Sequence, residues 1–154
     1  MPPVAHVYPL RVAYHETDAM AVAHHASYVK WFEEARVEWL RAAGLMEHHQ
    51  PYGPFVFAVV ALENRFRKPA RFDDELDVWT QARLEGRLRI RFQYALWSKR
   101  LQRFIAEGRT ELVALTEGFK PTRLPLELCA RFEREPWSDV WPPPPASPIR
   151  PDAN

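Results

Sequence analysis

Cysteine and lysine are scarce in this sequence, and long apolar runs are missing. The single cysteine, Cys129, excludes an internal disulfide and a zinc site built from several thiolates. No apolar run approaches the roughly 18 residues that a membrane-spanning helix needs. The first ten residues lack the basic start and the apolar stretch of a signal peptide. These absences predict a cytoplasmic protein without a membrane span.

The charge balance narrows the class of partner. The 154 residues carry a net charge of +1, with 47% hydrophobic and 27% charged residues, which is the composition of one ordinary globular domain. A near-neutral total argues against a dedicated nucleic-acid binder. Arginine outnumbers lysine by 17 to 4. This bias fits bidentate contacts with phosphate or carboxylate groups and fits a GC-rich genome equally well, so both explanations stay open.

Hydrophobic periods predict a strand followed by a helix. Residues 6–14 form the strand, which Pro9 restricts to a sheet edge or to a late start. The pattern breaks at residues 15–18. From about Ala26 the apolar residues recur with a period of 3.6, up to the natural C-terminal cap Gly44. The apolar face of this helix consists of Tyr28, Trp31, Phe32, Ala35, Trp39, Ala42 and Ala43.

The rest of the chain has strand character. Alternating apolar and polar residues joined by short turns predict antiparallel strands within residues 55–67, 76–84, 88–96 and 103–119. With the first strand they make an α+β fold, a five-stranded antiparallel sheet curled around one long helix. Residues 1–134 are assigned to this domain. The proline-rich residues 135–154 are predicted to be an extended or disordered tail, with Trp137 and Trp141 as candidates for docking on the domain.

Three ionisable side chains gather where the helix is predicted to begin. They are Asp18, His24 and His25. On spacing alone, an aspartate after a threonine in such a turn is most often a cap or turn former. A histidine near a helix start likewise caps or packs more often than it catalyses. Adjacent histidines point in different directions, so joint ligation of a metal is disfavoured, and we predict no metal and no cofactor.

Two segments carry a resemblance to a known family. Residues 14–36, Y-H-E-T-D-A-M-A-V-A-H-H-A-S-Y-V-K-W-F-E-E-A-R, resemble the signature of the 4-hydroxybenzoyl-CoA thioesterase branch of hotdog-fold acyl-CoA thioesterases. Residues 67–78, R-K-P-A-R-F-D-D-E-L-D-V, resemble the family's link into its third strand. The resemblance implies a hotdog fold, whose order of strand, helix and four strands is the predicted one. It also implies a homodimer or homotetramer in which sheets join and active sites lie at the interface.

The same resemblance implies roles for two residues of the cluster. Asp18 occupies the position of the family's catalytic carboxylate, acting as nucleophile on the thioester carbonyl or as base for a water. His25 occupies the first turn of the helix, where a backbone N–H of the family polarises the thioester oxygen. A helix N-terminus has unpaired N–H groups and a partial positive charge, which suit a developing oxyanion. The expected reaction is hydrolysis of a small to medium acyl-CoA to the free acid and CoA.

The sequence departs from the family's pattern at two places. Met20-Ala21 stand where the family usually has a glycine in the turn after the aspartate. We expect this loss to close off a positive-φ conformation or to narrow the approach of the backbone to the thioester. His24 replaces the aromatic residue that commonly precedes the family's histidine.

Coenzyme A carries three phosphates, so basic groups outside the acyl pocket are expected to bind it. A solvated strand face is the alternative for each of them. The candidates for substrate binding are Tyr14, Arg65, Lys68, Arg87 and Arg89, with Arg67, Arg71 and Arg91 beside them.

A second class of function stays open, a non-catalytic hotdog protein that binds acyl-CoA or a partner. It predicts thermal stabilisation by the ligand without turnover. A hotdog dehydratase is disfavoured because its H-x-x-x-x-P-x-x-P-G-type motif is absent, and the sequence has no RNA-binding signature.

Overall fold

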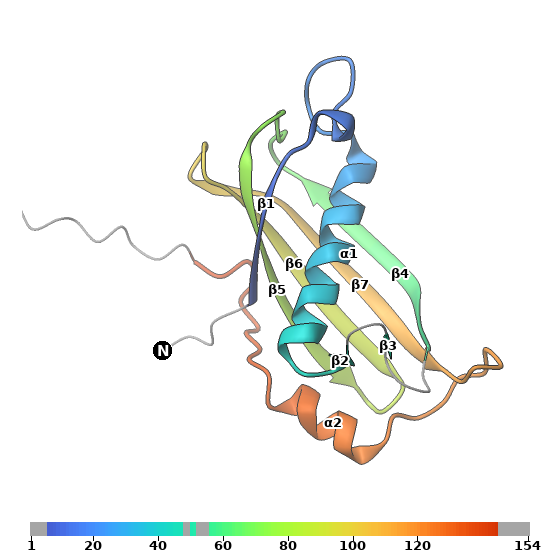
Figure 1. Cartoon of the computed structure of the whole chain (residues 1–154). Coiled ribbons are helices and arrows are strands. Elements are labelled where there is room, and N and C mark those ends of the chain that lie inside the picture. Colours follow the sequence, from blue (N-terminus) through green and yellow to red (C-terminus); the bar gives the residue numbers. More distant parts are fainter. Residues whose placement is uncertain (1–5, 48–49, 52–55, 145–154) are drawn as a thin grey trace, which may run out of the picture.

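A computed structural model describes residues 6–47, 50–51 and 56–144 (Figure 1). The order is a strand, a short 3-10 helix, a helix, six strands and a second helix. These elements are β1 (His6–Arg11), η1 (Tyr14–Glu16), α1 (His25–Ala42), β2 (Met46–Glu47), β3 (Gln50–Pro51), β4 (Val56–Phe66), β5 (Glu75–Glu85), β6 (Arg89–Ser98), β7 (Arg103–Leu115) and α2 (Leu126–Glu133).

Five of the strands form one antiparallel sheet in the order β1-β5-β6-β7-β4, which confirms the predicted sheet. The strand β1 is at one edge, where Pro9 lies opposite Asp77. An edge tolerates proline because the missing N–H faces no neighbouring strand. The strand β4 forms the other edge. The two-residue strands β2 and β3 pair with each other in the segment between α1 and β4.

The helix α1, 18 residues long, lies across one face of the sheet (Figure 1). Its buried side chains follow the predicted 3.6-residue period, although Ala42 at its end is exposed. Phe32 stacks on Tyr94 of β6, with ring centroids 4.8 Å apart. A Cβ at Gly108 of β7 would lie 2.6 Å from Phe32 Cε2, so glycine there lets the helix side chain approach the strand backbone. This packing holds α1 against β6 and β7.

The prediction of a single helix was incomplete, because α2 follows the sheet. Its eight residues are too few to show a clear period, and long-range contacts hold it in place. Phe132 stacks on Trp39 of α1 with a centroid distance of 5.7 Å, and Arg131 Nη1 donates to Gly44 O at 2.6 Å. The helix therefore covers the C-terminal end of α1, far from the start of that helix.

After α2 the chain runs over β5. The Gln81 side chain accepts from Ser138 N and donates to Ser138 O, both at 2.9 Å. The Arg83 guanidinium lies 4.3 Å from the ring centroid of Trp137. Residues 135–144 of the predicted tail thus contact the domain in an irregular conformation, and residues 145–154 lie outside the described residues.

Candidate active site

Asp18 lies in a tight loop between β1 and α1. An antiparallel bridge between Thr17 and Ala23 closes this loop, and Asp18 N donates to Val22 O at 2.9 Å. The Asp18 carboxylate is exposed, and its Oδ1 accepts from Met20 N at 2.8 Å. Within the part of the chain that the structure describes, Oδ2 has no hydrogen-bond partner. Asp18 therefore forms the turn through Oδ1, as the spacing suggested, and its Oδ2 stays accessible.

The loop keeps a left-handed residue although it lacks the family's glycine. Ala21 has a φ of 59°, and its N–H donates to Asp18 O at 3.0 Å. The expectation that losing glycine closes off a positive φ is therefore wrong for the backbone itself. The alanine adopts a conformation that is unfavourable for its Cβ, because the surrounding bonds determine the turn. These bonds include Phe72 N to Ala21 O at 3.3 Å and Ala23 N to Ala70 O at 2.8 Å.

The start of α1 leaves one backbone donor unoccupied. His24 is the N-cap, and its Nδ1 accepts from Ala26 N at 3.1 Å while its carbonyl accepts from Ser27 N at 2.9 Å. The His25 N–H, at the first helical position, has no acceptor among the described residues. Since this end of a helix also carries partial positive charge, the His25 N–H is suited to bind an oxygen that becomes negative. The departure at His24 thus has a structural use as a cap.

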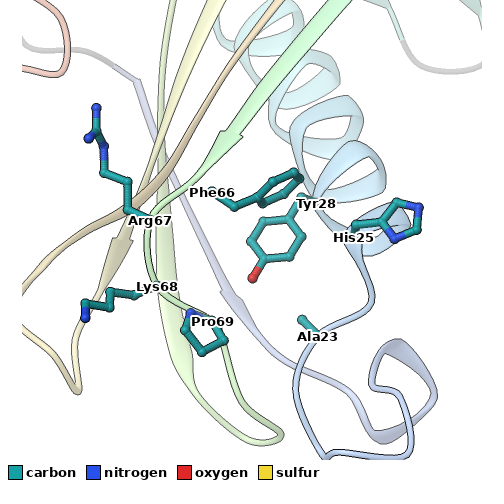
Figure 2. Close-up of a pocket in the computed structure, with 7 residues that line it drawn as sticks. All are labelled: Ala23, His25, Tyr28, Phe66, Arg67, Lys68 and Pro69. Carbon is teal, nitrogen blue, oxygen red and sulfur yellow. The ribbon is translucent and has the colours of Figure 1, made fainter.

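A cavity of about 300 Å³ opens between the start of α1 and the end of β4 (Figure 2). Tyr28 and Phe66 form its apolar side, with ring centroids 4.8 Å apart and an angle of 77° between the rings. In Figure 2 the His25 ring points away from both of these rings. The lining residues are Ala23, His25, Tyr28, Phe66, Arg67, Lys68 and Pro69.

The Tyr28 hydroxyl is a polar group that the helix pattern assigned only to the core. It accepts a hydrogen bond from Ala70 N at 3.1 Å. Burial raises the pKa of Tyr28, the hydrogen bond from Ala70 N lowers it in part, and the charge of Asp74 raises it further. The hydroxyl therefore stays protonated at neutral pH and can donate into the cavity. The signal that could have identified it is its place within residues 14–36, the segment that resembles the family's signature, four residues after the N-cap His24.

The structure brings only part of the predicted substrate-binding set to this cavity. Lys68 lines it, although its ammonium end points away from Tyr28 (Figure 2). Tyr14 is 79% exposed and meets Phe72 edge-to-face beside the Asp18 loop. The remaining three residues of the set are arginines that bind other groups: Arg65 pairs with Glu63, Arg87 donates to Leu124 O, and Arg89 pairs with Glu111.

Among the described residues, no three His, Cys, Asp or Glu side chains converge in a way that could hold a metal ion. The His24 and His25 rings lie against each other, with centroids 4.2 Å apart and an angle of 30° between the rings, so the expectation that they point in different directions is wrong. In the same residues, no helix is long and apolar enough to cross a membrane.

Comparison with known proteins identifies the family. The model of the thioesterase-like superfamily matches residues 12–132, which include the Asp18 loop, α1 and the whole sheet after β1. The chain belongs to the thioesterase-like superfamily. Membership confirms the resemblance to hotdog thioesterases, and the chain is a thioester hydrolase.

Individual relatives agree with this assignment. The chain is 33% identical over 130 residues to the acyl-CoA thioesterase YbgC of Haemophilus influenzae. The matched segment covers 81% of this chain and 92% of the relative. It is 32% identical to a hypothetical protein from Thermus thermophilus of known structure, with a TM-score of 0.75 over 82% of this chain and 96% of that one. The DHNA-CoA thioesterase of Staphylococcus aureus shares the fold with a TM-score of 0.75 at 24% identity, over 84% of this chain and 89% of that one.

Proposed function

We propose that this thioester hydrolase cleaves small to medium acyl-CoA esters to the free acid and CoA, with Asp18 and the His25 N–H as the reacting groups. The observation that carries the proposal is the closed loop between them. The bridge between Thr17 and Ala23 brings the end of the loop next to Asp18. Two residues after Ala23, α1 begins at His25, whose N–H has no acceptor among the described residues. A carboxylate and an oxyanion donor are thereby held at the same end of the fold.

The two groups divide the reaction between them. The free Oδ2 of Asp18 attacks the thioester carbonyl, or takes a proton from an attacking water. The carbonyl oxygen becomes negative as the new bond forms, and the His25 N–H stabilises it together with the helix N-terminus. The C–S bond then breaks, and the sulfur leaves as a thiolate. Thiolate is a good leaving group, so the step needs no strong general acid. If Asp18 itself attacked, the product is an anhydride between the acyl group and Asp18, which a water then hydrolyses to the free acid and the regenerated carboxylate.

The cavity supports a substrate with a short acyl part. Its volume of about 300 Å³ is at the lower end of the range for small-molecule pockets. Phe66 and Tyr28 offer an apolar wall, and the Tyr28 hydroxyl offers one hydrogen bond. Lys68 at the rim has no ion pair among the described residues, so it is the best placed of the predicted phosphate-binding groups. The roles proposed for Tyr14, Arg65, Arg87 and Arg89 stay predictions.

The direct test is a turnover panel. Release of CoA is followed with a thiol reagent on acyl-CoA esters from short aliphatic through aromatic to long-chain, for the wild type and Asp18→Asn. Asp139→Asn is the matched control, since Asp139 has 92% of its side chain exposed and lies against Arg83. We expect release by the wild type and the control, and loss of most of it in Asp18→Asn. Binding of acyl-CoA without release in all three proteins would favour the non-catalytic hypothesis.

We further propose that two copies pair through β4. This strand is eleven residues long, forms a sheet edge, and leaves five apolar side chains between 38% and 54% exposed: Val56, Val59, Val60, Leu62 and Phe66. An exposed apolar edge strand is a template for pairing with another strand. Phe66 also lines the cavity, so a second copy on β4 would lie next to the site.

Oligomeric mass tests this pairing. Light scattering after size exclusion should give twice or four times the mass of one chain for the wild type. Leu62→Glu should shift the protein toward lower mass, because a charge on the pairing face opposes its burial. The control is Leu126→Glu on α2, where the leucine is 70% exposed and away from β4. A wild type with the mass of one chain, or equal masses for the two variants, would contradict the proposal.

A further inference from the structure

Glu16 is a buried acidic residue that the proposed reaction does not use. It is 8% exposed, and both carboxylate oxygens are occupied. Oε1 accepts from Ala13 N at 2.7 Å, and Oε2 accepts from Trp31 Nε1 at 2.5 Å. Because these two donors hold both oxygens, the carboxylate is not available as a base or a nucleophile.

The backbone of Glu16 continues the same set of bonds. Its carbonyl oxygen accepts from His24 N at 2.9 Å and from Ser27 Oγ at 2.8 Å. One residue therefore bonds to the segment after β1, to the N-cap of α1, to its first turn and, through Trp31, to its second turn. Ser27 and Trp31 are themselves buried, at 5% and 1% exposure, so these bonds are shielded from water.

Both groups of the proposed reaction adjoin this network. Asp18 lies two residues after Glu16, and the bridge at Thr17 begins between them. The His25 N–H belongs to the residue after His24, whose own N–H is held by Glu16 O. We propose that Glu16 is a positioning residue, which sets where the Asp18 carboxylate lies relative to the His25 N–H. This inference rests on the proposed function, because it gives Glu16 a role only if those two groups act together.

The chemistry of the bonds explains why a carboxylate fits this position. Both groups that face Glu16 are N–H donors, and an ionised carboxylate is an acceptor at both oxygens. Glutamine has the same length, but its NH₂ would face one of the two donors and push the segment or the helix away. A shift of about 1 Å at the reacting groups is enough to cost roughly a hundredfold in rate. A residue that only fills the core would instead affect the stability of the fold.

The test compares kcat, KM and thermal unfolding for the wild type and a set of variants, well below their melting temperatures. Glu16→Gln is expected to lower kcat roughly tenfold to a hundredfold with little change in KM. Trp31→Phe should also lower kcat, because it leaves one carboxylate oxygen without its donor. In the double variant, Glu16→Gln with Trp31→Phe, the glutamine NH₂ no longer faces the indole N–H, because phenylalanine has no such donor. The fold-loss of kcat in the double variant should therefore be smaller than the product of the fold-losses in the two single variants.

Gln81→Ala serves as the control for stability. Gln81 is 2% exposed and makes several hydrogen bonds, but it lies in β5 and holds the C-terminal segment. This variant should lower the melting temperature and keep kcat. If Glu16→Gln and Trp31→Phe behave like Gln81→Ala, Glu16 is purely structural and the inference is wrong, while the proposed function stands. If Glu16→Gln does not fold, Trp31→Phe decides the question alone. If wild type and Asp18→Asn release CoA equally, the proposed function fails, and the inference fails with it.

Discussion

The Arg100 guanidinium binds the Asp74 carboxylate through two hydrogen bonds, with Nε 2.7 Å from Oδ1 and Nη2 3.0 Å from Oδ2. Asp74 also accepts from Arg71 N at 2.9 Å, and its carbonyl accepts from Val12 N at 3.0 Å. The turn that contains these residues pairs with the Asp18 loop through a bridge between Val22 and Arg71. The ion pair therefore stabilises the turn against which the Asp18 loop packs.

Replacing Asp74 by asparagine should lower the free energy of unfolding by about 1 to 3 kcal/mol at neutral pH, because a neutral amide with one acceptor oxygen replaces a buried carboxylate that accepts from Arg100 and from Arg71 N. Urea unfolding monitored by tryptophan fluorescence measures the change. Asp73→Asn is the matched control, since this neighbouring side chain is 61% exposed and its pair with Arg11 is open to solvent. We expect the control to change the free energy by less than about 0.5 kcal/mol. Equal effects of the two variants would contradict this role of Asp74.

The stability of the protein should also depend on pH through Asp74. Burial raises the pKa of this carboxyl, but the hydrogen bonds from Arg100 and Arg71 N outweigh burial and hold the pKa below its ordinary value. Because the folded pKa is below the unfolded value of about 3.9, the contribution is complete above that pH and is lost as the pH falls through the folded pKa. The difference in free energy of unfolding between the wild type and Asp74→Asn should therefore shrink as the pH is lowered from about 4. A constant difference over that range would contradict the assignment.

The left-handed turn at Ala21 is a place where a substitution should stabilise the fold. A left-handed conformation costs alanine about 1 to 2 kcal/mol, and glycine avoids that cost. Glycine also loses more entropy on folding, so we expect Ala21→Gly to raise the free energy of unfolding by about 0.5 to 1 kcal/mol. The same substitution in α1, Ala26→Gly, should lower it. Destabilisation by Ala21→Gly would show that the methyl group makes a contact worth more than the backbone strain.

The contact between Phe32 and Gly108 predicts that an alanine substitution lowers stability at Gly108 but not at Gly118. A Cβ at Gly108 would lie 2.6 Å from both Phe32 Cε2 and Asn64 Oδ1, so Gly108→Ala should cost about 1 to 3 kcal/mol by overpacking. At Gly118 the nearest atom to a Cβ is Thr116 Oγ1 at 3.7 Å, so Gly118→Ala should change stability by less than about 0.5 kcal/mol. Thermal unfolding of both variants under one condition makes the comparison.

The sequence predicted what local patterns determine. The apolar period from Tyr28 to Trp39 located α1, alternation located the strands of the sheet, and the motif around Asp18 pointed to the family. These signals work because side chains three or four positions apart share a face of a helix, and side chains two positions apart share a face of a strand. Pro9 was placed correctly for a different local reason, since a proline within a strand is tolerated at a sheet edge, where its missing N–H faces no neighbouring strand.

Contacts between distant segments could not be predicted in this way. The helix α2 depends on a stack between Phe132 and Trp39, which are 93 positions apart. The cavity joins the start of α1 to the end of β4, and the bond from Ala70 N to the Tyr28 hydroxyl has no local signature. Glu16 looked like part of a turn, because nothing in the sequence shows that Trp31 donates to it.

The backbone role of His25 can be separated from that of its ring. Proline has no N–H but fits the first position of a helix, where that N–H makes no helical bond. The residue before a proline must be extended, and His24 already has φ −62° and ψ 140°. His25→Pro should therefore fold like the wild type while it lacks the proposed oxyanion donor. We expect its kcat to fall roughly 100- to 1,000-fold, which is the usual effect of removing one such donor.

His25→Ala is the partner variant, because it removes the ring and keeps the N–H. Its kcat should stay within about tenfold of the wild type, since the ring points away from Tyr28 and Phe66 (Figure 2). Circular dichroism and thermal unfolding show whether the helix start is intact in both proteins. A large loss in His25→Ala with little further loss in His25→Pro would reverse the assignment. The imidazole, rather than the helix N-terminus, would then be the group that acts on the thioester.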